Sequence, residues 1–190
     1  MKLFLILLSA MLVNNYVFVR FLGICPFLGV SKRTSTALGM GVAVTFVLVM
    51  SSAFSWALDQ LLINLHLEFL RTIVFILVIA TFVQFVEAFL KKNNETLYEA
   101  LGIYLPLITT NCIILGIAIV NSLSKYTFFE SVFNALGAGL GFLLALIIFS
   151  GIRERLELYD IPKPFLNLPI SMITASLLSL AFMGFQGMIK

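Results

Sequence analysis

The chain contains two cysteines, Cys25 and Cys112, and both begin the same pattern, Cys-x-x-Leu-Gly followed by valine or isoleucine. Thiolates bind soft metals and iron–sulfur clusters, and a pair of thiols can also form a disulfide or work as a redox dithiol. A single cysteine in apolar sequence most often fills a gap as a small hydrophobic residue. Two cysteines at equivalent places of a repeated pattern indicate instead a disulfide, a redox dithiol or half of a metal site.

The number of thiols limits what a metal centre here would need. Iron–sulfur clusters are commonly held by four cysteine thiolates, so two of the ligands would have to come from a neighbouring subunit. A redox dithiol would need an exposed thiolate of low pKa, and nothing polar near Cys112 beyond Asn111 would stabilise one. Metal coordination deprotonates a thiol directly, which makes a shared centre the less demanding hypothesis.

Two charged residues within apolar stretches also need an explanation. Arg20 lies five residues before Cys25, where an uncompensated charge costs about 2.5 to 3.5 kcal/mol on insertion scales. We expect Arg20 to compensate negative charge, either on a cysteine-ligated centre or on an acidic residue of a partner. The equal alternative is that its side chain extends to the membrane–water interface or donates a structural hydrogen bond to Asn14 or Asn15. Glu87 fits either an ion path or a pair with the lysine four residues later.

Composition sets the class of protein. The chain has 190 residues, of which 61% are hydrophobic and 11% charged, and its mean hydropathy is +1.10. Such a chain has too little polar surface to cover a water-soluble globule, so we predict an integral membrane protein. The net charge of +3 does not indicate nucleic acid, because the basic residues fall in short loops, where they report orientation.

Six apolar stretches are long enough to cross a hydrocarbon core, which takes about 20 residues each. They are residues 3–22 (continuing to 31), 37–58, 69–90, 97–123, 129–150 and 168–189. The basic residues, Arg20 apart, divide between the two sides as Lys32, Arg33, Lys91, Lys92, Arg153, Arg155 and Lys163 against Lys2, Arg71, Lys125 and Lys190. Seven against four predicts that both termini lie outside the cytoplasm.

The two halves of the single membrane domain, about 1–92 and 97–190, repeat one another. Besides the cysteine patterns, Leu-Gly-Met-Gly at 38–41 matches Leu-Gly-Ala-Gly at 136–139. Three spans in each half force opposite orientations, which predicts inverted repeats with a site near mid-membrane, built from interrupted helices. We expect Pro26 to interrupt the first span and to push Cys25 out of helical angles, and Pro106 to act more weakly in the fourth. The glycines of both halves, including Gly39, predict close helix packing.

The patterns around both cysteines, Leu22 to Lys32 and Asn111 to Gly116, resemble the A subunit of the Rnf (Rsx) ion-translocating electron transport complex. They are also similar to the homologous E subunit of the sodium-translocating NADH:quinone reductase. The resemblance covers essentially the whole chain. It implies an all-α membrane protein of six helices in two inverted three-helix repeats, with the first and fourth helices interrupted near the cysteines.

The resemblance also implies a function. Cys25 and Cys112 would ligate a [2Fe-2S] cluster together with two cysteines of a homologous E subunit of opposite topology. The cluster would relay electrons across the prokaryotic cytoplasmic (inner) membrane, in a complex with B, C, D and G subunits that links ferredoxin and NAD to sodium-ion or proton transport. The chain would have no activity alone. The alternatives are an E-type subunit of the quinone reductase, a secondary transporter with inverted repeats, and a membrane thiol oxidoreductase.

Overall fold

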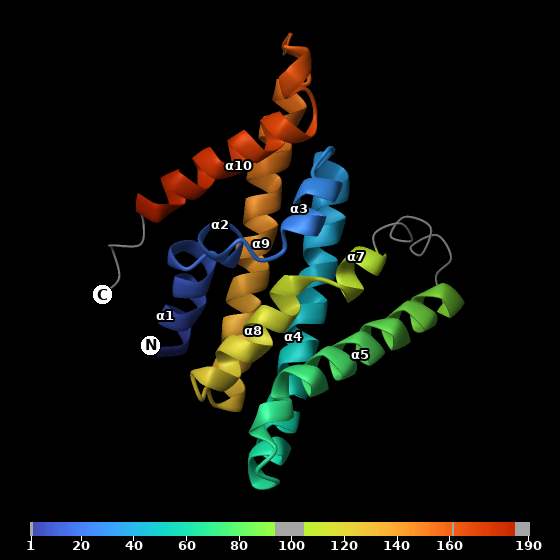
Figure 1. Cartoon of the computed structure of the whole chain (residues 1–190), viewed down its shortest axis with the longest axis vertical. Coiled ribbons are helices and arrows are strands. Elements are labelled where there is room, and N and C mark those ends of the chain that lie inside the picture. The colour runs from blue at the N-terminus through green and yellow to red at the C-terminus, as the bar shows by residue number, and fades with distance from the viewer. Residues whose placement is uncertain (1, 94–104, 161, 185–190) are drawn as a thin grey trace.

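The computed structural model describes residues 2–93, 105–160 and 162–184, and all regular secondary structure among them is helical. Figure 1 shows the arrangement of these helices. In chain order they are α1 (Lys2–Leu8), the π-helix η1 (Ser9–Val13), α2 (Tyr16–Arg20), α3 (Ile24–Val30), α4 (Thr34–Asn64), the 3₁₀ turn η2 (Glu68–Leu70), α5 (Arg71–Asn93), α7 (Leu105–Thr109), α8 (Cys112–Leu123), α9 (Phe128–Leu156), the 3₁₀ turn η3 (Lys163–Phe165) and α10 (Leu168–Met183).

An antiparallel pair of long helices, α4 and α9, forms the centre of the molecule (Figure 1). Small residues let the two helices approach closely, because a Cβ atom at Gly41 would overlap the side chain of Leu143 and one at Gly139 would lie 2.7 Å from Thr45. Helices that cross at small residues gain van der Waals contact along their backbones. The glycine pattern that predicted close packing is therefore confirmed at this crossing.

The other side of α9 carries the beginning of the chain. A Cβ atom at Gly137 would lie 2.6 Å from the carbonyl oxygen of Leu7, and one at Gly141 would lie 2.9 Å from that of Met11. These two glycines, four residues apart, seat α1 and η1 against α9. The same prediction is wrong for Gly39, where an added Cβ meets no atom within 4 Å.

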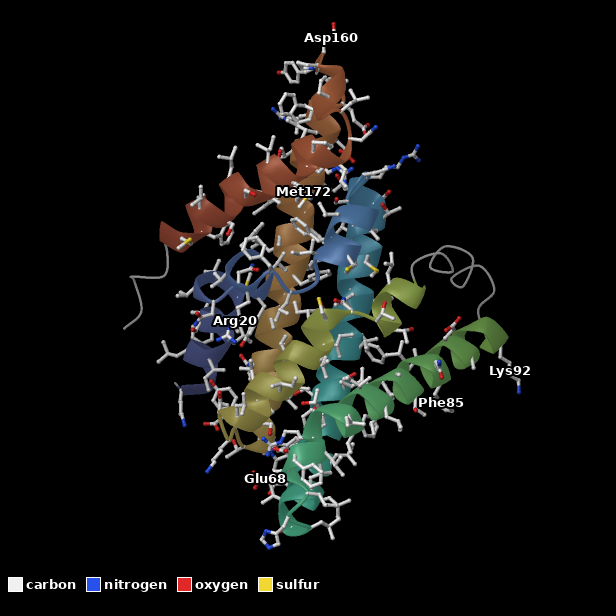
Figure 2. The ribbon with its side chains drawn as sticks, in the orientation of Figure 1. Arg20, Glu68, Phe85, Lys92, Asp160 and Met172 are labelled. Carbon is white, nitrogen blue, oxygen red and sulfur yellow. The ribbon has the colours of Figure 1, made fainter. Side chains whose placement is uncertain are left out.

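The protein is a multi-pass membrane protein. Three helices of the described residues are long and apolar enough to cross a membrane, Thr34–Asn64, Glu68–Ala88 and Phe128–Leu156, and three shorter apolar segments accompany them, Lys2–Val13, Leu107–Leu123 and Leu168–Met183. The first part of the predicted fourth span, 97–104, lies outside the described residues. Helices α5 and α10 diverge from the central pair (Figure 1), and α5 carries Phe85 and Lys92 along its diverging part (Figure 2).

Both predicted interruptions are present, but proline does not cause them. The first helix breaks at residues 14–15 and again at 21–23, and α3 then contains both Cys25 and Pro26 in its first turn. The expectation that Pro26 breaks the helix and forces Cys25 out of helical angles is therefore wrong, because the first turn of a helix needs no proline N–H. Pro106 likewise lies in the first turn of α7, and the second break follows at 110–111.

Candidate functional site

The first interruption is closed by the side chain of Asn15, which is fully buried. Its Oδ1 accepts a hydrogen bond from the backbone N–H of Val17 (3.1 Å) and so caps α2. Its amide donates to the carbonyl oxygens of Met11 (3.3 Å) and Gly141 (3.0 Å). A break at membrane depth leaves backbone groups without partners. Asn15 bonds two such groups, those of Val17 and Met11, and its bond to Gly141 ties the break to α9. The sequence gives one signal of this role, an asparagine pair inside an apolar run.

The turn before Cys25 depends on glycine. Phe21 and Gly23 both have left-handed backbone angles, with φ of 55° and 80°. A Cβ atom at Gly23 would lie 3.0 Å from the ring of Phe142 and 3.4 Å from Oδ1 of Asn111. Glycine is the residue that adopts this conformation without steric cost, so Gly23 permits both the turn and its close approach to the second interruption.

The second interruption repeats the use of asparagine. Oδ1 of Asn111 accepts a hydrogen bond from the N–H of Ile113 (3.3 Å) and caps α8, whose first residue is Cys112. Asn111 is 4% exposed, and its Nδ2 atom has no hydrogen-bond partner among the described residues. Helix N-termini favour negative charge. Cys112 therefore lies at the N-terminus of α8, directly after a buried amide whose nitrogen has no partner among the described residues.

One hydrogen bond joins the two interruptions. The backbone N–H of Gly23 points to Sγ of Cys112 at 2.9 Å. Cys25 follows Gly23 by two residues, so the two cysteines, 87 positions apart in the chain, lie in one region of the molecule. Both cysteines are free and exposed at the surface of the chain. The structure thus brings together the residues that the sequence predicted, and it adds the N–H of Gly23, which no sequence pattern indicated.

The glycines of the two cysteine patterns explain why the patterns match. A Cβ atom at Gly116 would lie 2.6 Å from Leu22, which precedes Cys25. A Cβ atom at Gly29 would lie 3.7 Å from Leu107, which precedes Cys112. Each pattern glycine therefore faces a leucine of the opposite interrupted segment, with the tighter fit at Gly116.

Helix α3 carries Cys25 near its N-terminus, and its C-terminal end contacts α9. Nη1 of Arg153 donates to the carbonyl oxygen of Leu28 and to Oγ of Ser31, both at 2.8 Å. The ring of Phe27 stacks on Phe149 with 4.2 Å between centroids. From the sequence alone, Arg153 is predicted only to add to the basic residues on one side of the membrane. Its contacts show that it also satisfies the C-terminal end of α3.

Within the described part of the chain, no hydrogen bond, ion pair or ring contact joins the remaining charged candidates, Arg20 and Glu87, to the cysteines. Arg20, seen in Figure 2, is exposed and its guanidinium lies 5.7 Å from the ring centroid of Tyr16. Among the described residues no hydrogen bond joins Arg20 to Asn14 or Asn15; the side-chain oxygen of Asn15 accepts from Val17, and the amide of Asn14 donates to Ser9. Glu87 is half-buried on α5, and the side chain of its suggested partner falls outside the described part.

The donor set around the cysteines fits half of an iron–sulfur site. Within the described ranges, no three His, Cys, Asp or Glu side chains converge on a common point, so the chain offers two thiols and no third ligand of these types there. Both thiols are exposed, which leaves them open to a neighbouring subunit. Soft thiolates suit iron–sulfur clusters, and the amide of Asn111 is a donor that a negatively charged centre would use.

Comparison with known proteins decides the family. The sequence profile described as "Rnf-Nqr subunit, membrane protein" matches residues 3–189. The chain belongs to the Rnf-Nqr family. Among its Rnf-Nqr relatives, the A subunit of the Na(+)-translocating ferredoxin:NAD(+) oxidoreductase complex of Acetobacterium woodii is 54% identical over 99% of this chain and 98% of the relative. The A subunits of ion-translocating oxidoreductase complexes are 55% identical in Syntrophotalea carbinolica, over 99% and 98%, and 56% identical in Azotobacter vinelandii, over 100% and 98%.

Proposed function

We propose that this protein is the A-type membrane subunit of an Rnf-type ion-translocating ferredoxin:NAD oxidoreductase complex. It works as one part of a multi-subunit enzyme and relays electrons within the membrane, coupled to transport of sodium ions or protons. The family match over residues 3–189 and the names of relatives at 54 to 56% identity support the assignment to the complex. Because these relatives are named as A subunits of an oxidoreductase complex, we favour the Rnf-type complex over the quinone reductase.

The contact between Gly23 and Cys112 supports the relay itself. We propose that Cys25 and Cys112 supply two thiolates to a [2Fe-2S] cluster and that a homologous E subunit of opposite topology supplies the other two. When bound, such a cluster takes up and passes on one electron. The N–H of Gly23 donates toward the sulfur of Cys112, and the amide of Asn111 is available to do the same, so this chain stabilises negative charge at the centre.

The same proposal includes the symmetry and the orientation of the chain. Each half has a helix break just before its cysteine, at 21–23 and 110–111, a Cys-x-x-Leu-Gly pattern and a long helix, α4 or α9, and these two helices run antiparallel (Figure 1). These features support inverted repeats about an axis in the membrane plane, six crossings in all. The seven-to-four distribution of basic residues supports an inner-membrane protein with both termini outside the cytoplasm.

Iron content and electron paramagnetic resonance of the purified complex test the relay. We expect Cys25→Ala and Cys112→Ala each to remove the same [2Fe-2S] signal, and to reduce ferredoxin:NAD electron transfer to background, because a cluster lacking one thiolate ligand is lost. Ser176→Ala, at an exposed serine of α10, is the control and should keep iron, signal and turnover. Cysteine variants that assemble with unchanged iron and unchanged spectra would refute the proposal, and a transporter would keep its activity in them.

A further inference from the structure

A second polar region lies away from the cysteines, at the end of the molecule where α4 ends and α5 begins. It is a cavity of about 480 Å³ between the ends of α4, α5, α8 and α9. The charge distribution assigns this end to the outside of the membrane, because Arg71 and Lys125 belong to the less basic side. Glu68, which lines the cavity, marks its position in Figure 2.

An ion pair forms one wall of the cavity. The carboxylate of Asp59, 5% exposed, accepts a hydrogen bond from Nε of Arg71 (2.7 Å) on one oxygen and from Oγ of Ser122 (2.6 Å) on the other. Four charged side chains line the cavity, and Asp59 and Glu68 balance Arg71 and Lys125. The cavity is therefore polar but carries no net charge.

The inner wall holds a hydroxyl group whose hydrogen-bonding capacity is unused. Ser131 is fully buried, it lines the cavity, and its Oγ has no hydrogen-bond partner among the described residues. Buried hydroxyl groups are normally paired. An unpaired Oγ in a roomy polar cavity indicates a ligand with affinity for oxygen, and hard cations prefer oxygen ligands.

A chain of hydrogen bonds leads from this wall toward the interrupted segment. Asn121 donates to the carbonyl oxygen of Ser131 (3.3 Å) and to Oγ of Ser52 (3.0 Å). Asn134 donates to Oδ1 of Asn121 (2.7 Å) and reaches the hydroxyl of Tyr16 at 3.5 Å. Tyr16 is the first residue of α2, which directly precedes the turn that carries Gly23 and Cys25. Buried polar side chains at this depth are costly without partners. These side chains satisfy one another and connect the cavity wall to α2.

We propose that this cavity is a weak binding site for the transported monovalent cation on the outer side of the membrane, from which the ion leaves the protein. This inference rests on the proposed function. The hydroxyl oxygens of Ser131 and Ser122 supply ligands, and the ion pair of Asp59 with Arg71 prevents the carboxylate from holding the cation tightly. A site that must release its ion has to bind it weakly, and neutralisation of Asp59 achieves that.

Sodium transport into inverted membrane vesicles tests the proposal, with the full complex carrying each variant. The vesicle lumen faces the cavity, so sodium loaded into the lumen should inhibit further uptake of ²²Na⁺. Arg71→Gln leaves Asp59 without its counter-charge, and we expect the luminal sodium concentration for half-inhibition to fall by about tenfold or more. Ser131→Ala removes one oxygen ligand and should raise that concentration severalfold.

Ser150→Ala is the matched control, because Ser150 is a buried serine of the same helix that lies near the other end of α9 and bonds to Ile147. It should behave as the parent. If Arg71→Gln fails to assemble, Lys125→Gln changes the charge of the cavity in the same direction at an exposed residue and should shift inhibition the same way by less.

Unchanged inhibition in both the charge variant and Ser131→Ala, or an equal shift in Ser150→Ala, would overturn the inference. So would a parent complex that transports no sodium. Neither result affects the electron relay, which the iron and resonance measurements on the cysteine variants test separately.

Discussion

The two helix interruptions use the same residue type in different ways. The side-chain amide of Asn15 bonds only to backbone groups: its oxygen accepts from the N–H of Val17, and its nitrogen donates to the carbonyl oxygens of Met11 and Gly141. Its side chain leaves no unused group and is fully buried. Side-chain hydrogen bonds of Asn15 therefore take the place of missing backbone ones at this break.

At the second interruption only half of the asparagine is used. Asn111 accepts from Ile113, but its amide nitrogen has no partner in the described part of the chain. A buried donor without a partner costs about 1 to 3 kcal/mol, and this one lies next to Cys112. At the first break the whole amide group is used for structure, while the second leaves one donor unused, as the proposed cluster at the cysteines requires.

Of the substitutions considered, Asn15→Ala is expected to lower the stability of the protein most. Asn15→Ala removes the side-chain partner of the N–H of Val17 and of the carbonyl oxygen of Met11 at the break, at about 1 to 3 kcal/mol for each buried group. We expect the free energy of unfolding of the purified protein in detergent to fall by about 3 kcal/mol or more. Thermal unfolding followed by circular dichroism measures it. An equal loss in Asn111→Ala would remove the contrast between the two breaks.

An intermediate effect is expected at Gly23, which joins the two breaks. Gly23→Ala forces a side chain into a left-handed conformation, which costs about 1 to 2 kcal/mol, and brings Cβ to 3.0 Å from the ring of Phe142. The same unfolding measurement should show this loss. Gly39→Ala is the control, because its Cβ meets nothing and alanine favours the helix by about 0.5 to 1 kcal/mol. If both variants unfold alike, the turn does not require glycine.

Asn111→Ala is expected to have the smallest effect on stability, together with a specific effect on the redox potential of the proposed cluster. Loss of the cap on α8 costs about 1 kcal/mol. If the free amide donates to a cluster on Cys112, its loss should move the midpoint potential of that cluster to more negative values, because hydrogen bonds to the sulfurs stabilise the reduced form. Redox titration followed by resonance spectroscopy measures the shift. Asn14→Ala should leave the potential unchanged, and an unchanged potential in Asn111→Ala would assign the amide to structure alone.

Much of this architecture could be predicted from composition and repetition. Runs of apolar residues predicted the long helices, and the repeated Cys-x-x-Leu-Gly pattern predicted that Cys25 and Cys112 lie close together, because the fold brings equivalent positions of the two halves together. The position of the breaks was predicted less well. Pro26 predicted the wrong break, because a proline in the first turn of a helix is tolerated. The actual turn lies just before it, at Gly23, and depends on left-handed backbone angles that no residue pattern specifies.

The contacts that hold the site could not be predicted in this way. Asn15 bonds to Gly141 across 126 positions, and Ser179 donates to the carbonyl of Phe18 across 161. Such pairings have no periodicity, since they depend on how separate helices cross. The cavity beside Asp59 was missed for the same reason, because its wall combines polar residues from several helices and only its basic members entered the charge count.

The crowding along α9 decides where reporter groups can be attached to follow motion in this protein. At Gly137, Gly139 and Gly141 even a methyl group would collide with neighbouring backbone or side-chain atoms, so a spin label there would disturb the helices it is meant to observe. Gly151, further along the same helix, and Gly39 on α4 have open space around them. Labels at that pair would let the separation of the two central helices be measured while the complex turns over.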